Sequence, residues 1–195
     1  RSMHASHPSP VFQVRGLVKS YGERRVLDGL EFDVERGESF VILGRSGTGK
    51  SVTLRQLNGL EQPDEGSILF HGEEIVGLSE AALNPLRRRV AMLFQGGALF
   101  DSMTVHENLA FPLREHTDRD DEQIASTVRE KLDMVRLGDV GDKLPAALSG
   151  GMRKRVALAR SLILEPEAML FDEPTTGLDP MTSATIANLI RTAQR

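Results

Sequence analysis

The sequence contains no cysteine and no tryptophan, a single tyrosine, and no long apolar run. The absence of cysteine excludes disulfide bonds and thiolate metal sites. No apolar stretch approaches the roughly 18 residues that a membrane-spanning helix needs, and no signal-peptide core is present. These absences predict a soluble, cytoplasmic chain without a membrane span of its own.

A strong excess of charge of one sign is also missing. The formal net charge is −4 at pH 7, which argues against a nucleic-acid partner because nucleic-acid-binding surfaces are basic. With 195 residues, 39% of them hydrophobic, the chain is long enough for one domain with a sizeable core. Residues 1–10 are polar and lack periodicity, so we expect a flexible tail there and a folded domain over 11–195.

Three short apolar runs punctuate the chain: 40-FVIL-43, 90-VAMLF-94 and 168-AMLF-171. Continuous runs of this length are typical of strands buried on both faces of a parallel sheet. Buried helix segments are the alternative, but polar or glycine-rich turns bound each run closely. We therefore expect a parallel sheet covered by helices.

Two further regions have different patterns. Residues 11–34 alternate loosely between apolar and polar side chains and predict antiparallel strands that flank the core sheet. Helical periodicity dominates a later region, where Thr104 and Glu107 fit a capping box. One helical face there collects apolar residues, namely Ile124, Val128, Leu132 and Val135.

The first apolar run is followed by 44-GRSGTGKS-51, which matches the pattern G-x-x-x-x-G-K-[ST]. Its glycines let backbone N–H groups wrap around phosphates, Lys50 can reach the β- and γ-phosphates, and Ser51 can ligate Mg²⁺. The alternative is a glycine-rich turn with a solvated lysine. The position after a predicted strand and before a helix-compatible stretch favours the phosphate loop.

Acidic and amide side chains follow the other two runs. Asp172 comes directly after the third run, where P-loop enzymes hold Mg²⁺, and Glu173 is placed to orient a water at the γ-phosphate. Gln95 follows the second run and could touch both the metal and the attacking water, or be a plain polar strand end. In an open α/β sheet these strand ends share one carboxyl edge, so the groups can converge.

The stretch 148-LSGGMRKRVALAR-160 places two glycines at the start of a predicted helix. Glycines there leave backbone N–H groups uncovered at the positive end of the helix dipole, which can hold an anion. The basic side chains that follow, residues 153–155, are expected to form a solvated helix face rather than contact a ligand.

Five motifs together resemble the nucleotide-binding domain of the ATP-binding cassette (ABC) ATPases. In chain order they are 44-GRSGTGKS-51, Gln95, 148-LSGGM-152, 169-MLFDE-173 and 176-TGLD-179. The resemblance covers about residues 11–195, and the LSGG signature in this order is highly specific. It implies an α/β P-loop NTPase core with a parallel sheet, an N-terminal antiparallel β subdomain, and an inserted helical subdomain at about residues 97–160.

The resemblance also implies roles for single residues, with ATP and Mg²⁺ as ligands. Tyr21 resembles the aromatic residue that stacks on adenine. Mg²⁺ would be held by Ser51, Gln95 and Asp172, and Glu173 would be the general base, with Gln95 as its catalytic neighbour. The phosphate cradle would consist of Gly44, Arg45, Ser46, Gly47, Thr48, Gly49, Lys50 and Ser51, with Val52 at the next backbone N–H.

In this family the helix start at Ser149, Gly150 and Gly151 closes on ATP bound to a second subunit. The expected partners are therefore a second copy of the chain, in an ATP-dependent homodimer, and a membrane permease that keeps the protein at the inner face of the cell membrane. Asp179 would lie in the loop that couples the two sites. Met152 departs from the glutamine of many family members, and a thioether cannot make that residue's hydrogen bond to ribose.

Within the family, residues 94–117 (FQGGALFDSMTVHENLAFPLREHT) resemble the Mla-type ATPases, which power phospholipid movement between bacterial membranes. The resemblance implies a permease and, beyond it, a periplasmic lipid-binding protein of the Mce type. The alternatives are a variable helical surface, an importer or exporter of another solute, a non-transport ABC ATPase, or a nucleotide-binding module that does not hydrolyse. The presence of both Asp172 and Glu173 argues against the last of these.

A histidine is missing where the family has one. ABC ATPases carry a switch histidine on a strand beyond the Asp179 loop, whereas the five histidines here all precede that loop. The sequence ends at Arg195, inside the helix that Asp179 as N-cap and Pro180 at the first helical position predict. We therefore expect a C-terminally truncated domain that binds nucleotide but hydrolyses it poorly, with the full protein continuing to a strand that ends in histidine.

Overall fold

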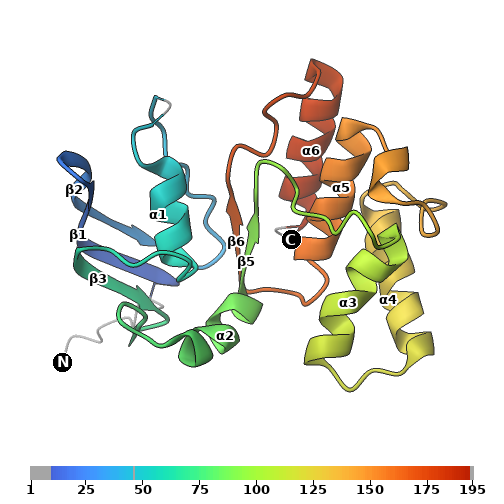
Figure 1. Cartoon of the computed structure of the whole chain (residues 1–195), viewed down its shortest axis with the longest axis horizontal. Helices are drawn as coiled ribbons and strands as arrows, with labels where there is room; N and C mark the ends of the chain where they lie inside the picture. The colour runs from blue at the N-terminus through green and yellow to red at the C-terminus, as the bar shows by residue number, and fades with distance from the viewer. Residues whose placement is uncertain (1–9, 46, 194–195) are drawn as a thin grey trace, which may run out of the picture. The chain divides into compact units, whose positions relative to one another are not determined.

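The computed structural model describes residues 10–45 and 47–193, without the side chains of residues 192 and 193 (Figure 1). Apart from Pro10, the predicted tail lies outside the described residues. The chain forms two compact units, Arg1–Arg87 and Arg88–Arg195. Among the described helices, none combines the length and the apolar character that crossing a bilayer requires.

An antiparallel sheet dominates the first unit, with spatial order β2-β1-β3-β4. Its strands are β1 (Phe12–Tyr21), β2 (Arg24–Val34), β3 (Glu65–Phe70) and β4 (Glu73–Glu74). β1 pairs antiparallel with β2 on one side and β3 on the other, which confirms the strands expected over residues 11–34. Val14, Leu17 and Ile68 of this sheet are fully buried. The register of β1 shifts between Val14 and Leu17, which puts both on the buried face although they are three residues apart.

The first unit also contains the helix α1 (Lys50–Leu57) and all but the last two residues of α2 (Glu80–Arg89). α1 begins inside the predicted phosphate loop, as expected for the helix-compatible stretch that follows it. It turns Val52 and Leu57 inward, and both side chains are buried. In α2, Arg87 donates to the carbonyl of Gly59 at 2.9 Å and so ties the helix to the segment that follows α1.

The prediction of a buried strand over residues 40–43 is wrong. No strand is assigned there, and Val41 is 69% exposed and Leu43 88% exposed. Phe40 instead stacks on Phe32 of β2, with ring centroids 4.7 Å apart. An apolar run of this kind is typical of a strand in a covered sheet, but a strand also needs a neighbouring backbone to complete its ladder. The sequence pattern does not specify that neighbour.

The other two apolar runs do form parallel strands, in the second unit. β5 (Val90–Leu93) pairs with β6 (Ala168–Phe171), in register from Val90 opposite Ala168 to Leu93 opposite Phe171. The pairing continues past both ends, because Glu167 N–H donates to Arg89 at 2.8 Å and Asp172 N–H donates to Leu93 at 3.1 Å. Val90, Leu93 and Leu170 are buried, and the remaining strand residues are half-buried.

Helices make up most of the second unit (Figure 1). They are α3 (Val105–His116), α4 (Asp121–Met134), the 3-10 turn η1 (Pro145–Ala147), α5 (Gly150–Ser161) and α6 (Pro180–Ala193). The capping box predicted at Thr104 and Glu107 opens α3, and a second one, from Asp120 and Gln123, opens α4. Because each box satisfies backbone N–H groups at a helix start, both helix boundaries are set locally.

The core of the second unit forms where α3, α4 and α5 meet. The predicted apolar face of α4 is confirmed, since Ile124, Val128 and Leu132 are all at most 2% exposed, and Val135 just past its end is fully buried. α5 is buried on more than one side at residues 156–159. Burying a side chain of this size contributes about 1.5–3 kcal/mol, so this cluster fixes the scaffold on which the predicted signature stands.

Candidate functional site

The predicted phosphate loop of the first unit depends on glycine at particular positions. Gly49 has φ of 94°, and a Cβ there would lie 2.6 Å from Leu27 Cδ2. Gly47 has φ of 77°, and a Cβ on Gly44 would collide with the hydroxyl of Thr48. The backbone therefore winds tightly before α1, which is how such a loop presents N–H groups to phosphate. Ser46, also predicted to take part, lies outside the described residues.

Lys50 lies across this loop. Its ammonium donates to the carbonyls of Gly44 at 2.7 Å and Arg45 at 2.8 Å. The hydroxyl of Thr48 also donates to the Arg45 carbonyl, at 2.8 Å. The positive charge is thus held at the loop by carbonyl oxygens, which a phosphate oxygen can replace as a stronger, charged acceptor.

The start of α1 provides the rest of the predicted cradle. Gly49 is its N-cap, and the carbonyl of Gly49 accepts from both the backbone N–H and the hydroxyl of Thr53. Ser51 and Val52 follow in the first turn, with the Val52 side chain 8% exposed. Their N–H groups belong to the helix N-terminus, where the dipole favours an anion.

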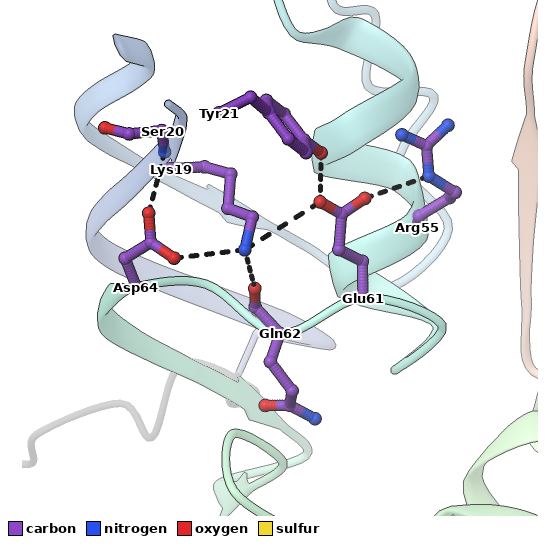
Figure 2. Close-up of polar contacts among 7 residues, drawn as sticks. All are labelled: Lys19, Ser20, Tyr21, Arg55, Glu61, Gln62 and Asp64. Carbon is purple, nitrogen blue, oxygen red and sulfur yellow. Dashed lines mark hydrogen bonds and ion pairs between the residues drawn. The ribbon is translucent and has the colours of Figure 1, made fainter. Parts of the chain in front are cut away.

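Tyr21 stands at the end of β1 and is linked to the loop through one residue. It pairs with Arg24 of β2, and Arg24 donates to the carbonyl of Gly47 at 2.9 Å. The Tyr21 side chain is 47% exposed, and its hydroxyl donates to Glu61 (Figure 2). The first unit therefore brings together the predicted base-stacking residue and the predicted phosphate cradle.

In the second unit the predicted amide and carboxylates follow the ends of two neighbouring strands. Gln95 lies two residues beyond β5, and Asp172 directly follows β6, where its N–H is bonded to the last residue of β5. Because the strands are parallel, both residues leave the same edge of the pair. This is the edge at which such sheets bind ligands.

Glu173 has an unusual backbone. Its φ is 47°, a left-handed conformation that residues with a Cβ rarely adopt, at a cost of about 1–3 kcal/mol. Its carbonyl accepts from the N–H of Thr176 at 3.2 Å, and its carboxylate accepts from the hydroxyl of the same residue at 3.0 Å. The turn leaves Glu173 exposed, which suits a group that must meet substrate.

The turn after Glu173 is held by Lys154 of α5. The Lys154 ammonium donates to the carbonyls of Pro174 at 3.2 Å and Thr176 at 2.7 Å. Burial lowers the pKa of Lys154, while the negative charge of Glu173 acts in the opposite direction. No sequence pattern predicts this contact, because its partners are 20 and 22 residues away and are backbone atoms.

The expectation of a solvated basic face over residues 153–155 is therefore wrong. Arg153, although exposed, donates to the carbonyl of Leu148 at 3.0 Å, and Arg155 donates to those of Val135 and Arg136 at 3.3 Å. The side chains instead tie α5 to three different loops. The physical reason is that loop carbonyls left without backbone partners attract long cationic side chains.

The predicted signature forms the start of α5. Ser149 is the N-cap, and its hydroxyl accepts from the N–H of Met152 at 3.2 Å. A Cβ on Gly150 would meet nothing within 4 Å, whereas one on Gly151 would lie 2.6 Å from Thr182 Cγ2 of α6. The two glycines thus differ, since Gly150 leaves an open approach to the backbone and Gly151 allows two helix starts to pack closely.

Asp179 caps α6, as predicted. Its carboxylate accepts from the N–H groups of Met181 and Thr182, both at 3.0 Å, and from the Thr182 hydroxyl at 2.5 Å. These hydrogen bonds, led by that of the Thr182 hydroxyl, lower the pKa of Asp179. The role of Asp179 in coupling two sites stays a prediction.

The donor set fits the nucleotide and metal that the motifs imply. Gly44 and Gly49 stand where a Cβ would collide with neighbouring side chains, so the tight backbone turn depends on them. A hydroxyl, an amide and a carboxylate, as in Ser51, Gln95 and Asp172, are oxygen donors of the kind that Mg²⁺ takes. Among the residues that the structure describes, no three histidine, aspartate or glutamate side chains gather as an all-protein metal site.

Comparison with known proteins follows the same motifs. Residues 27–176 match the family model described as ABC transporter. A probable ribonucleotide transport ATP-binding protein, mkl of Mycobacterium leprae, is 48% identical over 91% of this chain and 51% of its own length. The intermembrane phospholipid transport system ATP-binding protein MlaF of Escherichia coli is 46% identical over 91% of this chain and 66% of its own length.

A solved structure has the same fold. The dimeric structure of a post-hydrolysis state of the ATP-binding cassette MJ0796, bound to ADP and Pi, superimposes with a TM-score of 0.87 at 30% identity, over 94% of this chain and 83% of that one. The α/β cassette fold expected from the sequence is therefore confirmed, and the chain spans about half to two thirds of the curated relatives named above. The chain belongs to the ABC transporter family, where it corresponds to the ATP-binding domain.

Proposed function

We propose that the chain binds and hydrolyses ATP as the nucleotide-binding subunit of an ABC transporter. The observation that carries the proposal is that the same chain has a glycine-dependent loop bonded to Lys50 and two acidic residues, Asp172 and Glu173, directly after β6. ATP hydrolysis by purified protein, alone and with its permease, tests it, with Lys50→Ala as the control. Hydrolysis by Lys50→Ala at the parent rate would contradict the assignment.

In the proposed mechanism, binding and chemistry fall to different groups. The Tyr21 ring stacks on adenine, and the backbone N–H groups of 44–52 with Lys50 hold the phosphates. Ser51, Gln95 and Asp172 would hold Mg²⁺, which neutralises charge on the phosphate oxygens when bound. Glu173 accepts a proton from water as the water oxygen attacks the γ-phosphorus, the bond to the bridging oxygen breaks, and ADP and phosphate result.

Assembly with a second copy is part of the proposal. The open approach at Gly150 and the capped helix start at Ser149 suit a γ-phosphate brought by another subunit. The dimeric structure of the MJ0796 cassette supports this arrangement. Light scattering of Glu173→Gln should report a dimer with ATP and Mg²⁺ and a smaller species without nucleotide; a monomer at saturating ATP counts against it.

Phospholipid is the substrate that we propose for the whole transporter, acting for envelope lipid asymmetry through a membrane permease. The support is the resemblance of residues 94–117 to Mla-type ATPases and the MlaF relative. A ribonucleotide is the second candidate, because a relative at nearly the same identity is described as a probable ribonucleotide transport protein. The two are separated by reconstituting the protein with its permease in liposomes and asking which of phospholipid or ribonucleotide stimulates ATP hydrolysis.

A further inference from the structure

Tyr21 is held by a side-chain network that the roles above do not explain (Figure 2). Its hydroxyl donates to one carboxylate oxygen of Glu61, and the other oxygen accepts from Arg55 Nε at 3.0 Å. The Glu61 side chain is only 17% exposed, although Tyr21 itself is half exposed. The polar tip of an otherwise accessible ring is thus anchored on a shielded carboxylate.

Arg55 fixes Glu61 from two directions. Besides the contact to the carboxylate, the Arg55 carbonyl accepts from the N–H of Glu61 at 3.3 Å and from that of Leu60 at 2.8 Å. Arg55 belongs to α1, the helix that begins at Lys50 of the phosphate loop. A continuous set of contacts therefore joins the phenol of Tyr21 to the helix that holds the predicted cradle.

Residues of β1 next to Tyr21 also contact the network through ion pairs and hydrogen bonds. Lys19 Nζ lies 3.0 Å from Asp64, 3.9 Å from Glu61 and 5.7 Å from the centre of the Tyr21 ring. Asp64 in turn accepts from the N–H of Ser20 at 2.7 Å (Figure 2). The charged groups next to the phenol are thus Glu61 and Arg55, while the Lys19 ammonium lies over the ring, which stays half exposed.

We propose that Glu61, itself fixed by Arg55, is a positioning residue that orients the ring of Tyr21 for the base of a bound nucleotide. An aromatic ring that is already held in place loses less conformational entropy when a base stacks on it. Glutamate at this position thus acts on affinity without touching the nucleotide. The inference rests on the proposed function in one respect, the contact between Tyr21 and the base.

Tyr21 can be observed directly, because the chain has one tyrosine and no tryptophan. Partial burial and the hydrogen bond to Glu61 raise the pKa of Tyr21, and Arg55 opposes them. Ultraviolet titration of the phenol should therefore give a midpoint above that of free tyrosine. Glu61→Ala should lower this midpoint, and Glu61→Gln, a neutral acceptor of nearly the same shape, should lower it less. An unchanged midpoint in Glu61→Ala overturns the contact itself.

Nucleotide affinity tests the consequence of this contact. Glu61→Ala should weaken ATP and ADP binding equally, by about two- to tenfold, the range expected for ordering one side chain. The KM for ATP should rise with kcat unchanged, and Glu61→Gln should restore most of the affinity. Glu73→Ala, which removes an exposed carboxylate from β4 of the same sheet, is the matched control and should leave both readouts at the parent values.

A double variant shows whether Glu61 acts through the phenol. Tyr21→Phe keeps the ring but loses the hydroxyl, so it should weaken ATP binding as Glu61→Ala does, and the two together should weaken it no further. Additive losses overturn the positioning role. If Tyr21→Ala left ATP affinity unchanged while Glu61→Ala still shifted the phenol titration, the contact would stand, but the base contact of the proposed function, and with it the positioning role, would fall.

Discussion

The two units hold their predicted site residues by different means. In the first, the loop at 44–51 is shaped by glycines whose backbone conformation or tight surroundings exclude a side chain, most clearly Gly49. In the second, the turn after Glu173 is held by the Lys154 ammonium, which reaches carbonyls 20 and 22 residues away. The first arrangement is specified within one contiguous motif, and the second by contacts between distant segments. Mutations in the two units should therefore have different effects on nucleotide binding, turnover and stability.

The largest effect is expected from Glu173→Gln in the second unit. The amide cannot take a proton from water, while the phosphate cradle of the other unit is unaltered. Hydrolysis should fall by about 10²- to 10⁴-fold, the range for loss of a general base, with ATP affinity retained. Single-turnover hydrolysis with protein in excess measures this even when the parent rate is slow.

Lys50→Ala is the counterpart in the first unit and should lose ATP binding itself. The comparison breaks if Glu173→Gln hydrolyses ATP at the parent rate, or if it loses affinity as Lys50→Ala does. Either result would mean that Glu173 does not serve chemistry separately from binding.

Replacing single glycines should reveal the same contrast in stability. Gly49→Ala forces a Cβ into a left-handed backbone and to within 2.6 Å of Leu27, so it should destabilise the protein by about 2–4 kcal/mol. Gly150→Ala meets nothing within 4 Å at a helix start and should change stability by less than about 1 kcal/mol. Urea unfolding monitored by circular dichroism compares the two variants.

Gly150→Ala also has a functional use, since it alters the backbone approach that a second subunit's ATP would need while leaving the fold intact. If Gly49→Ala and Gly150→Ala lost the same stability, the surroundings of Gly49 would not be tighter than those of Gly150, and the contrast between the two sites would be wrong.

The same contrast explains what the sequence could predict. The helix caps at Thr104 and Asp179, the helix start at Gly150, and the parallel pair β5 and β6 follow from local patterns, and the structure has all of them. Residues 40–43 were predicted wrongly, because apolar character indicates burial but does not supply a partner strand.

Contacts between distant residues were beyond the sequence patterns. Tyr21 and Glu61 are 40 residues apart, and Arg160 reaches the carbonyl of Ala98 at 2.6 Å across 62 residues. A lysine or arginine on a helix looks solvated in sequence, and only the fold shows which carbonyls it meets. The assigned roles at the site follow from motifs and stay predictions until the variants above are measured.

Lys154→Met should have an intermediate effect. Methionine keeps the apolar length of the side chain but cannot donate to Pro174 and Thr176, so the turn that aims Glu173 should loosen. Turnover should fall about tenfold, which corresponds to the lower end for hydrogen bonds of a charged group, with ATP affinity unchanged. Steady-state kinetics measure the split between kcat and KM.

The control for Lys154→Met is Lys143→Met, which removes an exposed lysine from a loop of the same unit. If both variants lose turnover equally, the effect is one of net charge and not of the contact to the turn. If neither does, the second unit does not depend on distant side-chain contacts in the way that the comparison requires.

The smallest effect concerns acid stability and compares one aspartate from each unit. The pKa of Asp64 is lowered by the N–H of Ser20 and then by Lys19, and that of Asp179 by the hydroxyl and then the N–H of Thr182. A carboxyl whose folded pKa lies below its unfolded value of about 3.9 stabilises the fold above that value. This contribution is lost as the pH falls through the lower folded pKa.

Both Asp64→Asn and Asp179→Asn should therefore flatten the fall of Tm below about pH 4 and leave a small loss of Tm at neutral pH. The effect of added salt on Tm should differ between the two variants. Part of the Asp64 contribution comes from the charge of Lys19, which salt screens, whereas Asp179 relies on hydrogen bonds at the start of α6. Thermal unfolding between pH 2.5 and 7, at low and high salt, measures how steeply Tm falls with pH in each variant and in the parent protein. If Asp179→Asn reproduced the parent acid slope, its carboxylate would contribute nothing as a cap, and the local specification of that helix start would have to come from Pro180 alone.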